Sequence, residues 1–72
     1  MESHWIRALI GMELNDAKKR AWKEGLSRGM MDIKTLPIHG TKKVEWPDDR
    51  MPRTIRIQYS AQNNKVLDAR IG

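Results

Sequence analysis

The sequence contains no cysteine among its 72 residues, which excludes a disulfide scaffold, thiolate chemistry and an iron–sulfur site. No apolar run approaches the length that a membrane-spanning helix needs. The first residues, Met1 to Trp5, lack the charged and then apolar pattern of a secretory signal. We therefore expect a cytoplasmic protein or the mature form of a secreted one, without a membrane partner.

The length and the net charge limit the number of domains and the class of partner. A chain of 72 residues predicts one domain, residues 1–72, which buries only about 60% of its unfolded surface. The formal net charge of +5 and a pI near 10.0 favour acidic partners, nucleic acid among them. This charge permits such partners without identifying one.

The N-terminal half contains one clear helical pattern. From Glu13 to Glu24 the apolar residues recur on one stripe and the basic residues face water. We expect Gly25 or Gly29 to end this helix. Before it, the segment from Trp5 to Ile10 is expected to be extended and to pack Trp5, Leu9 and Ile10 on the core. The expected core stripe of the helix is Leu14, Ala17, Ala21 and Trp22.

Three later segments are expected to be strands. The first runs from Met30 to Thr35, with Met31 and Ile33 inward. The second, Thr54 to Tyr59, alternates as a half-buried strand does. Its inward residues are Ile55, Ile57 and Tyr59, and its outward residues are Arg56 and Gln58. The third runs from Val66 to Ile71, after a turn at residues 60–64. The fold class is therefore α+β: one helix on a small mixed or parallel sheet. The sequence leaves the strand pairing open.

A long segment between the first two strands is the most unusual feature of the chain. Residues 40–53 combine Pro47 and Pro52 with many charges, so we expect an exposed loop without regular structure. Its large apolar residues look displayed rather than buried: Val44, Trp46 and Met51. A loop of this length in a small domain is more often functional than accidental.

Several short motifs, in order, resemble one family. They are Leu9-Ile10-Gly11, Ala17-Lys18-Lys19, Leu36-Pro37 and Arg70-Ile71-Gly72. Together they resemble the potato inhibitor I family of serine-protease inhibitors, over nearly the whole chain. The resemblance implies a non-enzymatic, monomeric protein without a cofactor, whose exposed loop enters a protease cleft and inhibits reversibly.

The resemblance also implies a binding loop. Counting from Leu36-Pro37 without a gap, Val44 falls on P1, the residue whose carbonyl carbon the protease attacks. A small β-branched P1 suits shallow apolar S1 pockets, so elastase-like or subtilisin-like proteases are expected. A shift of one residue would put Lys43 in S1 and favour trypsin instead. The implied loop residues are Thr41, Lys42, Lys43, Val44, Glu45 and Trp46.

The family braces this loop with arginines, and here the match is incomplete. Thr54 stands where the family has one of them, although Arg53 is adjacent. The loop is also about four residues longer, by the same alignment, and Lys43 stands where the family favours Thr. The implied bracing residues are Arg53, Arg56 and Arg70, expected to act on Glu45, and Gly72, whose carboxylate is expected to pair with Arg56 or Arg70. The alternative is that these arginines form solvated surface pairs of little energetic weight.

Other chemistry finds little support in the sequence. His4 and His39 are isolated, so no metal site is expected. No nucleophile-elbow pattern accompanies Ser60, so we do not expect an enzyme. A second hypothesis is that the same scaffold binds protein or nucleic acid and inhibits no protease. Its binding surface would be the loop or the basic face of the helix. This face is formed by Lys18, Lys19, Arg20, Lys23 and Arg28. The alternative is that the face is an ordinary solvated surface.

Overall fold

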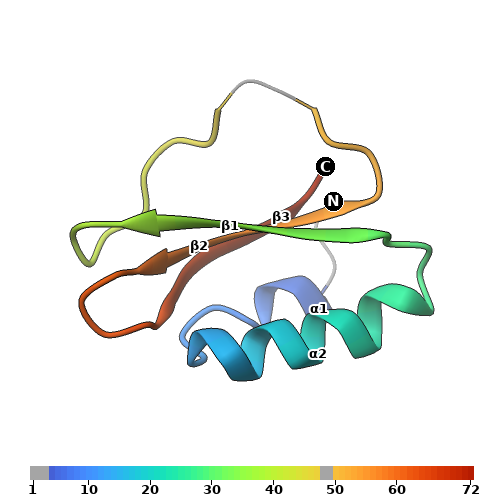
Figure 1. Cartoon of the computed structure of the whole chain (residues 1–72), viewed down its shortest axis with the longest axis horizontal. Coiled ribbons are helices and arrows are strands. Elements are labelled where there is room, and N and C mark those ends of the chain that lie inside the picture. Colours follow the sequence, from blue (N-terminus) through green and yellow to red (C-terminus); the bar gives the residue numbers. More distant parts are fainter. Residues whose placement is uncertain (1–3, 48–49) are drawn as a thin grey trace.

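The computed structural model describes residues 4–47 and 50–72. Its elements in chain order are α1 (His4–Arg7), α2 (Leu14–Leu26), β1 (Asp32–Ile38), β2 (Thr54–Ser60) and β3 (Val66–Ile71). The sheet has the order β1-β2-β3, with β1 parallel and β3 antiparallel to β2. Both helices lie on the same side of this sheet (Figure 1). The expected α+β class is thus confirmed, and the sheet is mixed.

Helix α2 follows the predicted amphipathic stripe but is longer than expected. Its start is capped by the Glu13 carboxylate, which accepts main-chain N–H groups of the first turn at 2.9 and 3.3 Å. Its end is set by Gly29 at φ 81°, where the Met30 N–H donates to the Gly25 carbonyl at 2.9 Å. Gly29 therefore ends the helix, whereas Gly25 lies inside it and is buried.

The N-terminal segment is helical, so the expectation of an extended segment from Trp5 to Ile10 was wrong. Helix α1 and the turn after it bury Ile6 and Leu9. These two residues are three apart, which brings them to the same side of a helical turn. Trp5 packs against the core as expected, but Ile10 is exposed.

Strand β2 is buried on both faces, which corrects the prediction of a half-buried strand. Arg56 is only 6% exposed and Gln58 is completely buried. Strand β2 is the middle strand, the helices cover one face of the sheet, and the loop after β1 lies over the other face (Figure 1). Two-residue alternation reports which face a side chain takes and does not report whether a loop covers that face.

The core joins the helices to β2 and β3. Strand β1 begins at Asp32, later than expected; Met31 is exposed and Ile33 is half-buried against the core. Leu14 is likewise partly buried, and Trp22 is exposed rather than part of the core. The fully buried apolar residues are Ile6, Leu9, Ala17, Ala21, Ile55, Ile57, Val66 and Ala69.

Candidate functional site

The loop of residues 39–53 is the candidate site, and the sheet topology determines its path. Because β1 and β2 are parallel, the chain that leaves the end of β1 must return to the start of β2. It returns over the sheet face opposite α2 (Figure 1). Residues 39–47 and 50–53 contain no helix or strand, as predicted. Asp48 and Asp49, part of the predicted loop, lie outside the described residues.

The middle of the loop is tied to the sheet through Gln58. The Val44 N–H donates to Gln58 Oε1 at 2.9 Å, and Gln58 Nε2 donates to the Val44 carbonyl at 2.7 Å. A side-chain amide here makes the pair of bonds that a neighbouring strand would make. Each such bond contributes about 0.5–1.5 kcal/mol net, and leaving the buried Gln58 amide without partners would cost more. Sequence reasoning missed Gln58, because an amide at an outward position of an alternating strand does not reveal that a loop covers it.

A second tie lies two residues further along, at Trp46. Its indole Nε1–H donates to Asp68 Oδ2 on β3 at 2.7 Å. The Arg56 guanidinium lies 5.3 Å from the centre of the same ring, in cation–π range. Trp46 and Met51 are half-buried, so the expectation that they are displayed was wrong for both. The reason is that Trp46 closes over the face of the sheet that Arg56 occupies.

The rest of the predicted binding loop is accessible. Residues 41–45 are all exposed, and Val44 is 47% exposed although its main chain is hydrogen-bonded to Gln58. The Lys43 Nζ lies 4.0 Å from Asp68 Oδ2, with 64% of the lysine side chain exposed. The segment therefore exposes its side chains to solvent, while hydrogen bonds to the sheet hold it in place.

The residues expected to brace the loop have other contacts. Within residues 4–47 and 50–72, no hydrogen bond or ion pair joins Glu45 to an arginine, and Glu45 is exposed. Arg56 packs on Trp46, and the exposed Arg70 is its neighbour across the β2–β3 pair. The Nη1 atom of Arg53 lies 3.8 Å from the Met31 sulfur.

The chain end is held by its main chain. The N–H of Gly72 donates to the carbonyl of Thr54 at 2.9 Å, beside the point where β2 begins. Gln58 and Asp68 tie residues 44 and 46 of the loop to the sheet by hydrogen bonds, and Arg56 contacts the Trp46 ring of the same loop.

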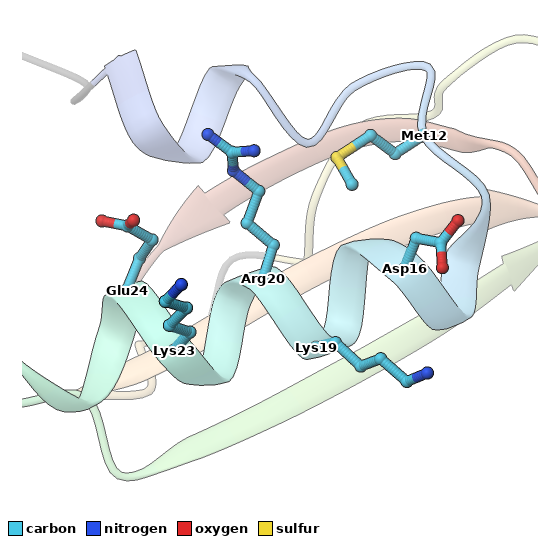
Figure 2. Close-up of a pocket in the computed structure, with 6 residues that line it drawn as sticks. All are labelled: Met12, Asp16, Lys19, Arg20, Lys23 and Glu24. Atoms are coloured by element: carbon cyan, nitrogen blue, oxygen red, sulfur yellow. The ribbon is translucent and has the colours of Figure 1, made fainter.

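A groove on α2 is the second candidate surface, and Figure 2 shows it. Arg20 extends toward α1 and Lys19 points away from it (Figure 2), while the carboxylates of Asp16 and Glu24 line the same groove. Glu24 also pairs with Arg28 at 2.8 Å. Charges of both signs therefore alternate here, which is typical of a solvated helix face and weakens the case for phosphate binding. The groove is lined by Met12, Asp16, Lys19, Arg20, Lys23 and Glu24.

Two other site types have no candidate in the described part of the chain. Residues 4–47 and 50–72 hold no cluster of three or more His, Asp or Glu side chains arranged to bind a metal ion. No helix in the same residues is long and apolar enough to cross a membrane.

No family model, no curated protein and no solved structure matches this chain. The resemblance to the potato inhibitor I family therefore stays a prediction that depends on the motifs quoted above.

Proposed function

We propose that this chain is a reversible serine-protease inhibitor that presents residues 41–46 to the protease cleft in the manner of a substrate. The observation that carries the proposal is the tie between Val44 and Gln58, at 2.9 and 2.7 Å. It holds the centre of an exposed loop in one conformation. The motif resemblance to a family of inhibitors supports the same function.

The physical argument concerns the ordering of the loop. A protease cleft binds an extended segment by main-chain pairing and reads its side chains in pockets. A flexible peptide must be ordered when it binds, whereas a loop already held in shape avoids that loss of entropy. Here the ties to Gln58 and Asp68 lie on the sheet side, and the side chains of residues 41–45 face solvent.

The sheet also supports inhibition after the loop is cut. The loop leaves β1 at Ile38 and enters β2 at Thr54, and these two strands are hydrogen-bonded along their whole length. A cut between them would leave two fragments that the sheet and the core still hold together. The new amine then stays close to the acyl-enzyme, so religation competes with hydrolysis.

The experiment is a titration against trypsin, chymotrypsin, elastase and subtilisin with chromogenic substrates. We expect at least one enzyme to lose activity stoichiometrically and reversibly at submicromolar inhibitor. As a matched control, Lys19→Ala changes a cation on α2, far from the loop in sequence, and should leave the inhibition constant unchanged.

Two outcomes would contradict inhibition. Rapid digestion of the folded chain without loss of protease activity would make the loop an ordinary substrate. Absence of inhibition together with strongly salt-dependent binding to generic DNA or RNA would favour the binding-module hypothesis.

A further inference from the structure

We propose that the residue that enters the S1 pocket is Lys43, that Val44 is P1′, and that the partner is a serine protease with an acidic S1 pocket. This inference rests on the proposed inhibitory function. It replaces the register obtained by counting from Leu36-Pro37, which put Val44 at P1.

The orientation of the Val44 main chain opposes Val44 as P1. The carbonyl of a P1 residue must face the protease, where oxyanion-hole donors approach its oxygen to about 2.7–3.1 Å. The Val44 oxygen instead accepts from Gln58 Nε2 at 2.7 Å, on the sheet side of the loop. Its N–H is also directed to Gln58, at 2.9 Å. Attack at Val44 would require both bonds to break first, and the ordering advantage of the loop would be lost.

The neighbours of Val44 face the other way. In an extended chain, the N–H and C=O of one residue point to one side and those of the next residue point to the opposite side. Both main-chain groups of Val44 reach the same side chain, as they do in that conformation. The main chains of Lys43 and Glu45 therefore turn outward. Neither has a main-chain hydrogen bond to any other described residue. Of the two residues that flank Val44, both Lys43 and Glu45 thus have carbonyls open to attack.

The position of the amine that leaves distinguishes a cut after Lys43 from a cut after Glu45. When the protease serine Oγ adds to the Lys43 carbonyl carbon, the bond to the Val44 nitrogen breaks. That nitrogen takes the proton that the protease base removed from the serine. It is the atom that donates to Gln58 Oε1 at 2.9 Å, so it stays beside the ester and can attack it. Religation restores the peptide bond and returns the serine hydroxyl. A cut after Glu45 would instead release the main-chain nitrogen of Trp46, which donates to no other described residue; the hydrogen bond of Trp46 to the sheet comes from its indole ring.

The charge of the segment agrees with this choice. The Lys43 side chain is 64% exposed, and its long contact with Asp68, 4.0 Å, leaves it free to enter a pocket. Lys42 precedes it, and the whole chain carries a net charge of +5. An acidic S1 pocket would be approached faster by such a loop than by a neutral one.

The experiment measures trypsin inhibition and identifies the bond that trypsin slowly cuts. Wild type should inhibit trypsin better than elastase or chymotrypsin, and sequencing of the slowly formed product should give a new N-terminus at Val44. Lys43→Ala should weaken trypsin inhibition by about 100-fold or more. Lys19→Ala, which removes the same charge from α2 outside the loop, should leave it unchanged. Lys43→Arg should retain inhibition.

A second pair of variants tests Gln58 as the positioning residue that retains the amine. Gln58→Met keeps the length of the side chain and removes both bonds to Val44, so the cut between 43 and 44 should be hydrolysed faster. Gln58→Glu keeps only the acceptor for the Val44 N–H and should fall between Gln58→Met and wild type. Thermal unfolding shows whether either variant folds, and the lysine variants test the register even if neither does.

The outcomes separate the register from the function. Inhibition of elastase or subtilisin with a cut after Val44, or of any protease with a cut after Glu45, overturns the register and leaves the proposed function standing. Equal losses in Lys19→Ala and Lys43→Ala also overturn it. Absence of inhibition by wild type against every protease removes both proposals.

Discussion

Gly25 provides a test of how closely α2 packs on the sheet. It lies in the last turn of α2 and is buried. A Cβ atom added there would lie 2.8 Å from Ile55 Cδ1 and 3.1 and 3.3 Å from the Cβ and Cγ of Met30. Gly25→Ala therefore introduces a methyl group at a point where the helix and β2 nearly touch.

Two effects of opposite sign act on the stability of Gly25→Ala. Alanine is a better helix former than glycine by about 1 kcal/mol, which stabilises the folded chain. Overpacking of a tight core typically costs about 1–3 kcal/mol. Ile55 is completely buried, so its side chain has little space into which to move. We expect overpacking to prevail and the free energy of unfolding to fall by about 1 kcal/mol.

The measurement is urea unfolding followed by circular dichroism, where a lower midpoint at unchanged slope reports lost stability. Ile55→Val serves as the control, because it removes Cδ1, the atom in the closest contact. Alone it should cost about 0.5–1.5 kcal/mol, and in the Gly25→Ala background it should cost almost nothing. The double-mutant cycle should thus give a coupling of about 1 kcal/mol. A stabilised Gly25→Ala protein, or additive effects, would refute the close approach of helix and strand.

Two further predictions concern the core and the loop. Ile57→Ala should lower the free energy of unfolding by about 2–5 kcal/mol because it opens a cavity at a completely buried site; a loss below about 0.5 kcal/mol would mean that this face of β2 does not meet the core. Trp46→Phe keeps an aromatic ring and removes the N–H that Asp68 accepts at 2.7 Å, so the loop should open more often. Hydrogen exchange of the Val44 amide should accelerate about tenfold while that of Ile57 is unchanged, and parallel acceleration of both amides would argue against a local opening.

The sequence predicted the elements that depend on local periodicity. The stripe of Ala17 and Ala21 placed α2, and the alternation of Ile55 and Ile57 placed β2 and its inward face. Helix α1 escaped prediction because its helical part is a single turn, too short for a helical period to be distinguished from an extended run.

The site was less predictable because it depends on contacts between distant residues. Charge and proline singled out the loop 40–53, and the family resemblance singled out residues 41–46 within it, but Gln58 and Asp68 are 14 and 22 residues away from their partners in the loop. Their roles follow from the loop crossing the sheet, which depends on the parallel pairing of β1 and β2. Sequence alone left that pairing open, so Gln58 was expected to be an outward residue without a partner in the loop, and Arg56 was assigned to Glu45 rather than to Trp46.

The two hydrogen bonds between Val44 and Gln58 hold the main chain of the loop and leave its side chains exposed. The hydrogen bonds of the Gln58 side chain to residue 44 involve the main-chain N–H and C=O, which nineteen of the twenty amino acids supply in the same form. Only proline lacks the N–H. The outward side chains of the loop can therefore be changed while Gln58 on β2 holds its main chain in the same conformation. A library randomised at residues 42–45 would vary the protease that is bound while the main-chain conformation of the loop stays the same. Every member of the library would still need Gln58.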